Sequence, residues 1–167
     1  DSKAFQKSVG LNGVGTKAVN ALSNYFKVTA FRDGKEKTAE FERGVLTQDH
    51  KETKTTEENG TLVTFVPDDK IFKNFHFVQE YLDNQFWNYC YLNAGLVMNL
   101  NNKRYVSKNG LLDLLQRKTN EDEIRYPIIH LKGEDIEVAL THENDYGEEY
   151  YSFVNGQFTT QGGTHLA

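Results

Sequence analysis

The stretch Ser8–Ser23, SVGLNGVGTKAVNALS, is the most informative segment of this sequence for fold and function. Its glycines, Gly10, Gly13 and Gly15, lie within six residues and lead directly into a predicted helix over 14–23. The first turn of a helix presents backbone N–H groups without intrahelical partners, together with a positive dipole end. Glycine lets such a turn approach an anion closely. Since each hydrogen bond to a charged oxygen contributes about 1.5–3 kcal/mol, several N–H groups could hold a triphosphate.

The same glycines also fit a turn that merely caps an ordinary helix, and this stretch alone does not decide between the two interpretations. It is not a P-loop, because Gly-x-x-x-x-Gly-Lys-Ser/Thr does not occur. Residues 13–18 match the dinucleotide pattern G-x-G-x-x-A, and Asp33 follows about 20 residues later. That pattern must follow an apolar strand, whereas residues 4–9 are polar and short. We therefore exclude a dinucleotide-binding fold.

C-terminal to the glycine turn and its helix, the residue pattern becomes typical of β-strands. We predict a strand at Tyr25–Arg32, a hairpin turn at Asp33-Gly34 and a return strand at Lys35–Arg43. The charged residues 47–60 indicate a solvated loop. A third strand is predicted at Thr61–Val66, before a turn that begins with proline.

The second half mixes helices with short strands. A helix is predicted over 75–93, and a short one over 110–117. The alternation Ile136, Val138, Leu140 predicts a strand with one buried face. Residues 118–125 are the best candidate for a domain boundary, and the fold class is α+β. The remaining strands are predicted at 96–100, 103–106, 126–132, 136–142 and 149–155.

Composition narrows the function classes. The chain has 167 residues, a net charge of -5 and a pI near 5.5, so it lacks the basic excess of a stand-alone nucleic-acid binder. Its single cysteine, Cys90, cannot form an internal disulfide, which favours a reducing, cytoplasmic environment. No stretch reaches the roughly 18 apolar residues of a membrane span, so we expect no membrane partner. Both ends look cut from something longer, although a processed mature protein fits as well.

Four segments, in this order, resemble the B subunits of bacterial type IIA DNA topoisomerases, which belong to the GHKL ATPase superfamily. Within that family, Asn12 and the residues 16–18 favour the topoisomerase IV branch over the gyrase branch. The segments that carry the resemblance are Ser8–Ser23, Gly60–Asp68 (GTLVTFVPD), Tyr91–Gly95 (YLNAG), and Tyr151–Asn155 (YSFVN) with Thr160–Leu166 (TQGGTHL).

The resemblance implies a fold in two parts. Residues 1–122 would form the C-terminal half of a GHKL (Bergerat-type) α/β sandwich ATPase domain, with residues 1–12 as the end of a mobile ATP lid. Residues 123–167 would form the first strands of a ribosomal-S5-like transducer domain. His165 would have a structural, hydrogen-bonded role there.

The resemblance also implies a nucleotide site. Backbone amides of the glycine turn would bind the β- and γ-phosphates of ATP, and the Thr61 hydroxyl would help to recognise adenine through a water. Phe5 lies where the family often has a tyrosine that reaches the nucleotide, so that contact is in doubt. The implied cofactor-binding residues are Gly10, Leu11, Asn12, Gly13, Val14, Gly15 and Thr61.

No catalytic or metal-binding residue is implied within the chain. The general-base glutamate, the asparagine that holds Mg²⁺ and the adenine-binding aspartate belong upstream in the family, and a phosphate-binding lysine belongs downstream. The implied partners are DNA, the A subunit of the topoisomerase and, on nucleotide binding, a second copy of the ATPase subunit, in the bacterial cytoplasm at the nucleoid. The alternative is a non-catalytic α+β interaction module whose glycine turn only caps a helix.

Overall fold

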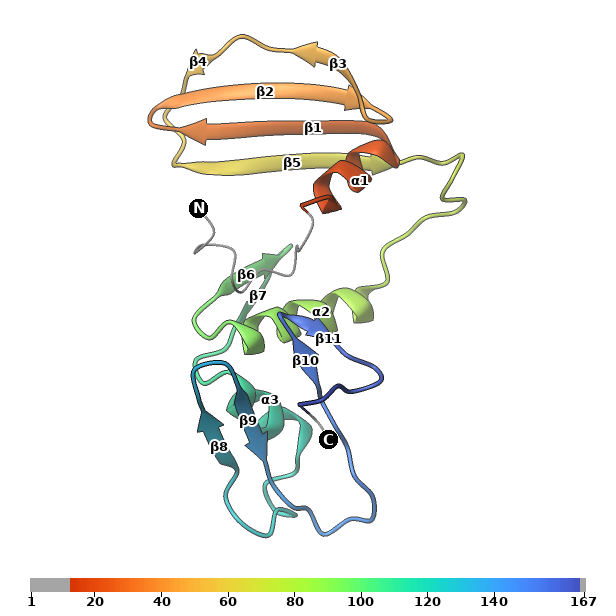
Figure 1. Ribbon diagram of the computed structural model, residues 1–167. Coiled ribbons are helices and arrows are strands. Elements are labelled where there is room, and N and C mark those ends of the chain that lie inside the picture. The colour runs from red at the N-terminus through yellow and green to blue at the C-terminus, as the bar shows by residue number, and fades with distance from the viewer. Residues whose placement is uncertain (1–12, 166–167) are drawn as a thin grey trace. The chain divides into compact units, whose positions relative to one another are not determined.

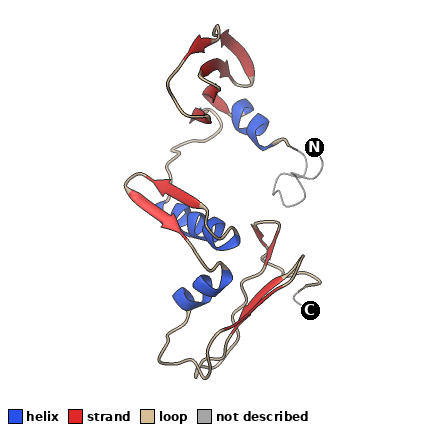
Figure 2. Ribbon diagram, turned by 90° about the vertical axis from the view of Figure 1, so that its left-hand side faces the viewer, coloured by secondary structure: helices blue, strands red, loops and turns tan. Residues whose placement is uncertain are grey.

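The computed structural model describes residues 13–165, which form two compact units, 13–76 and 77–165. Each unit combines helix and strand, so the predicted α+β class is confirmed (Figure 1; Figure 2). All strand pairs among the described residues are antiparallel, in agreement with the exclusion of a dinucleotide-binding fold. The division into units does not test the boundary predicted at 122/123, which stays a prediction.

The first unit is one antiparallel sheet with a short helix. The strands are ordered β3-β2-β1-β5, β4 also pairs with β2, and β5 therefore ends the sheet among the described residues (Figure 1). Helix α1 packs against β1, β2 and β5. The elements are α1 (Gly15–Ala21), β1 (Ser23–Arg32), β2 (Lys35–Glu42), β3 (Val45–Asp49), β4 (Thr53–Lys54) and β5 (Gly60–Pro67).

Local turn chemistry explains the β1–β2 hairpin. Asp33 and Gly34 have φ of 52° and 75°, the left-handed pair that a two-residue hairpin turn requires. The predicted hairpin and the predicted strand at Thr61–Val66 are confirmed. The prediction of a loop over 47–60 is wrong in part, because β4 and most of β3 lie there. The residues of these strands that fall within 47–60 are exposed and polar, so they carry no apolar alternation that could predict a strand.

The two faces of the sheet differ near α1. The Phe26 side chain is 3% exposed, whereas Tyr25, on the opposite face, is 37% exposed. Since α1 packs on this end of the sheet, it covers the Phe26 face. Directly paired residues of antiparallel strands share a face, so the register places Val28, Ala30, Thr61, Val63 and Phe65 on the same face as Phe26.

The second unit has a small aromatic core. Tyr105, Cys90, Tyr91 and Leu114 are buried, and the Trp87 ring stacks on Tyr91 with centroids 5.4 Å apart. The half-buried Trp87 therefore packs against this core. The elements are α2 (Gln79–Leu92), β6 (Val97–Leu100), β7 (Lys103–Val106), α3 (Leu111–Lys118), β8 (Ile129–Lys132), β9 (Glu137–Leu140), β10 (Phe153–Val154) and β11 (Gln157–Phe158).

Two predictions fail in this unit. The strand predicted at 149–155 is only the two residues of β10, which pair with β11. Ile136, Val138 and Leu140 are all exposed, so the predicted buried face is wrong for the described residues. Alternation shows which side chains share a face of a strand, but it does not show whether another element covers that face.

Candidate functional site

The described part of the glycine turn begins α1. Gly13 has φ of +61°, Val14 is the residue before the helix, and its carbonyl accepts the N–H of Ala18 at 2.9 Å. No side chain caps this end, and the first turn contains no acidic residue. Within the described residues, the first N–H groups of α1 thus have no side-chain acceptor, which leaves them available to an external anion.

Space around these glycines is open. A Cβ built on Gly13 or on Gly15 meets no atom within 4 Å, and the Val14 side chain is 55% exposed. The geometry therefore fits close approach of a phosphate to the main chain. Gly10, Leu11 and Asn12 lie outside the described residues, as do Phe5 and the rest of the predicted lid, so their predicted roles stay predictions.

Thr61 lies near the start of β5 and pairs with Ala30 of β1. Alanine cannot hydrogen-bond to it, and the Thr61 hydroxyl has no partner elsewhere among the described residues, so the cross-strand side-chain bond that an ordinary strand threonine could make is absent. Both residues line an open depression of about 430 Å³. The Thr61 hydroxyl is thus free to bind a small polar group or a water.

An apolar strip separates Thr61 from α1. Val63 and Phe65 are 45% and 40% exposed and share the face of Thr61 and of α1. At about 3.3 Å per residue, the strip from Thr61 to Phe65 extends about 13 Å. Along one face of the sheet, the Thr61 hydroxyl is therefore followed by the exposed apolar strip and then by helix α1. This combination is typical of sites for amphipathic ligands.

An ion pair between the partly exposed Arg43 and the buried Asp68 lies where α1 meets the sheet, and no role for it was predicted from the sequence. The Asp68 side chain is 2% exposed and accepts a hydrogen bond from Arg43 Nε at 2.5 Å. Hydrogen bonds from the Arg43 side chain and from the Lys70 backbone N–H hold the pKa of Asp68 below its usual value, despite burial. In the sequence, the two residues of this ion pair lie in two separate turns, Arg43-Gly44 and Pro67-Asp68. Local sequence patterns do not show that these turns are in contact.

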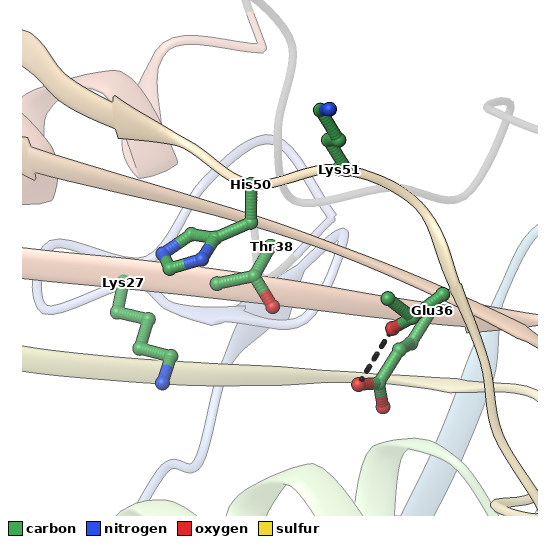
Figure 3. Close-up of a pocket in the computed structure, with 6 residues that line it drawn as sticks. Lys27, Glu36, Thr38, His50 and Lys51 are labelled. Atoms are coloured by element: carbon green, nitrogen blue, oxygen red, sulfur yellow. Dashed lines mark hydrogen bonds between the residues drawn. The ribbon is translucent and has the colours of Figure 1, made fainter.

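A second depression, of about 290 Å³, lies on the opposite face of the same sheet (Figure 3). Its polar groups largely satisfy one another: Thr53 Oγ1 donates to Glu36 at 3.2 Å, and a His50 ring nitrogen lies 2.8 Å from Glu40. Lys51 points away from the Glu36–Thr53 bond in Figure 3. This depression therefore lacks the unpaired, converging groups of a catalytic site.

The remaining candidates have structural roles. His165 Nε2 lies 2.7 Å from Ser152 Oγ, which confirms the expected hydrogen-bonded role of this histidine. In residues 13–165, no group of three or more His, Cys, Asp or Glu side chains could hold a metal ion. None of the described helices is long and apolar enough to cross a membrane.

Comparison with known proteins points to one family. A family model described as DNA gyrase B matches residues 91–167. The B subunit of DNA topoisomerase 4 from Borreliella burgdorferi is 47% identical over 96% of this chain, and the B subunit of DNA gyrase from Helicobacter pylori (strain 26695) is 34% identical over 100% of it. The alignments cover 27% and 23% of those proteins, so the chain spans about a quarter of their length.

A solved structure extends the likeness to the fold. The 43K ATPase domain of Thermus thermophilus gyrase B, in complex with an aminocoumarin, matches with a TM-score of 0.75 at 29% identity, over 97% of this chain and 48% of that domain. The likeness bears out the predicted GHKL-type ATPase fold. On these matches and on the motif order along the sequence, the chain belongs to the family of type IIA topoisomerase B subunits.

Proposed function

We propose that this chain supplies the phosphate-binding turn and part of the base-binding face of an ATP site in a type IIA DNA topoisomerase. The observation that carries the proposal is the open, uncapped start of α1 at Gly13–Gly15, inside a chain that aligns over almost its whole length with the B subunits. The match to an ATPase domain supports ATP as the ligand.

Each part of the sheet face has a task in this proposal. Main-chain N–H groups of residues 11–15 bind the β- and γ-phosphates, with Gly10 shaping the entry to the turn. Thr61 orients a water at the adenine, and Val63 and Phe65 supply the apolar surface on which the base lies. Bound ATP supplies the phosphoanhydride that is hydrolysed. Residues outside this chain hold Mg²⁺ and provide the general base.

For the whole protein we propose ATP-dependent strand passage of DNA, together with the A subunit of the topoisomerase, in the bacterial cytoplasm at the nucleoid. Two B subunits would dimerise when nucleotide binds, which requires tighter binding of ATP to the closed state than to the open state. We assign the topoisomerase IV branch, supported by 47% identity to the B subunit of one topoisomerase 4 against 34% to that of a gyrase.

Substitution of the open glycines tests the phosphate site. In the full-length protein, Gly15→Ala should raise the KM for ATP about tenfold, which corresponds to about 1.4 kcal/mol, because the new Cβ occupies the space that a phosphate needs. The fold should be retained, since alanine favours a helix over glycine by about 0.5–1 kcal/mol. Steady-state ATPase kinetics measure the change.

Gly13→Ala should have the same effect, with Gly147→Ala as its matched control. Gly13 and Gly147 have positive φ of 61° and 118°, and a Cβ on either meets no atom within 4 Å, so both substitutions strain the backbone without a steric clash, and the strain is larger at the control position. Only Gly13 lies in the glycine turn. Unchanged KM in both Gly13→Ala and Gly15→Ala would rule out the phosphate site.

A further inference from the structure

Helix α1 is joined to the sheet by hydrogen bonds at its C-terminal end. None of its residues is buried, so the side-chain packing of α1 on β1, β2 and β5 is partial. Its last turn is also held by hydrogen bonds: Asp68 N–H donates to Leu22 O at 2.9 Å, and Ser23 Oγ donates to Val19 O at 2.6 Å. The position of the glycine turn therefore depends on the junction at the other end of the helix.

The turn between β2 and β3 is part of this junction. Arg43 and Gly44 have φ of 50° and 81°, and the Arg43 N–H donates to Ser23 O at 2.9 Å. A Cβ on Gly44 would lie 3.4 Å from the Ala21 Cα, so this turn runs directly against the end of α1. Arg43 and Gly44 both have the left-handed φ that a two-residue hairpin turn requires, so the turn itself fixes where the Arg43 side chain starts.

What the Arg43 side chain does is neutralise Asp68. Arg43 Nε donates to Asp68 Oδ2 at 2.5 Å, and Lys70 N–H donates to Asp68 Oδ1 at 3.0 Å. The carboxylate is almost completely buried, and a buried charge is strongly destabilising without a partner. The ion pair thus ties the β2–β3 turn to the same backbone segment that holds Leu22 of α1.

We propose that Arg43 and Asp68 are positioning residues for nucleotide binding: their ion pair fixes the end of α1 on the sheet and so sets where Gly13–Gly15 meet the phosphates. Neither side chain belongs to the glycine turn, and both act through α1. This inference rests on the proposed ATP site.

Two single variants of the full-length protein and their combination test the proposal. Arg43→Gly removes the guanidinium and suits the left-handed φ, so the turn is preserved. Asp68→Asn removes the buried charge. Each variant should raise the KM for ATP about tenfold, because displacement of binding groups by about 1 Å is costly, with kcat at saturating ATP within about twofold. The double variant should be no worse than the more damaging single one, because both disrupt one interaction.

Asp69→Asn is the matched control, since this neighbouring aspartate is exposed and has no ion pair among the described residues; its KM should not change. If Gly15→Ala raises KM but Arg43→Gly does not, the positioning role is wrong and the ATP site stands. If none of these variants changes KM, both proposals fail. A fall in kcat at constant KM, or strictly additive effects in the double variant, would also overturn the positioning role. If Asp68→Asn does not fold, the result for Arg43→Gly alone decides between these outcomes.

Discussion

Gly163 lies at a position where the second unit has no room for a side chain. A Cβ there would lie 2.8 Å from His165 Cε1 and 2.9 Å from Nδ1, closer than real contacts allow. The His165 ring is held by Ser152, whose hydroxyl also accepts a hydrogen bond from Thr159 Oγ1 at 2.6 Å. The ring can move away only by giving up its bond to Ser152.

Gly163→Ala should therefore lower the free energy of unfolding by about 1 kcal/mol, the usual net value of one hydrogen bond. Urea denaturation of the 167-residue chain, followed by circular dichroism, measures the change. Gly60→Ala is the control, because its Cβ would lie at an ordinary 3.8 Å from the nearest atom, Glu58 O. Equal stabilities of the two variants would contradict the proposed crowding at His165.

Residue roles differ in how far the sequence predicts them. Three glycines before a helix allow an anion site to be predicted, beside the alternative of a plain helix cap, because the chemistry is local to a few residues. The role of Arg43 could not be predicted in this way, because its partner Asp68 is 25 residues away and the turns of both residues look ordinary. The depressed pKa of Asp68 likewise arises only when these two turns meet.

Among the elements, α2 and β7 are joined by a hydrogen-bonded cluster around Asp83. Lys103 Nζ lies 2.8 Å from Asp83 Oδ1, and the hydroxyl of the buried Tyr105 also donates to this carboxylate. Hydrogen bonds from Lys103 and Tyr105 lower the pKa of Asp83 to about 2 from an ordinary value of 3.8. Ionised Asp83 therefore stabilises the contact between the helix and the hairpin.

The pH dependence of stability follows from this shift. Because the pKa is lower in the folded state, the contribution of Asp83 is complete above about pH 4 and is lost as the pH falls towards about 2. Between these values, Asp83→Asn should make the urea midpoint less dependent on pH than in the unchanged chain. Asp135→Asn, at an exposed turn position, should leave the profile as it is. A profile unaltered by Asp83→Asn would show that the cluster does not stabilise the fold.

Elements that are specified by residues close together in the sequence were predicted correctly. Features that depend on contacts with residues distant in the sequence were not. Asp33-Gly34 specifies the β1–β2 hairpin through its own backbone preference. Strand β3 forms although all its side chains are exposed, because main-chain pairing with β2 holds it. For β9, the alternation correctly placed Val138 and Leu140 on one face, but among the described residues both remain about two-fifths exposed, at 38% and 40%, so no buried face forms.

For the molecule as a whole, charge is unevenly distributed along the sequence. The residues after Lys132 include seven acidic residues and no lysine or arginine. Such a segment repels the phosphates of nucleic acids, so it adds no DNA affinity. Contact with DNA in the proposed function must therefore come from other parts of the protein.

The 167-residue chain alone should bind nucleotide weakly. The acidic and basic side chains that the family uses to hold ATP and Mg²⁺ are expected outside this chain, and each charged hydrogen bond that is missing costs about 1.5–3 kcal/mol. Titration calorimetry with a non-hydrolysable ATP analogue and Mg²⁺ should show no binding in the micromolar range, whereas the full-length protein should bind. Micromolar affinity of the chain alone would mean that the glycine turn and Thr61 suffice.

Strand β5 has a practical consequence for anyone who prepares this chain. Among the described residues it has a sheet neighbour on one side only, and Leu62, Val63, Phe65 and Val66 are exposed along it. Its free main-chain groups can therefore recruit a strand from another molecule, and repeated recruitment builds fibres. Storage of the protein at low concentration and low temperature would slow this aggregation, and light scattering would detect it.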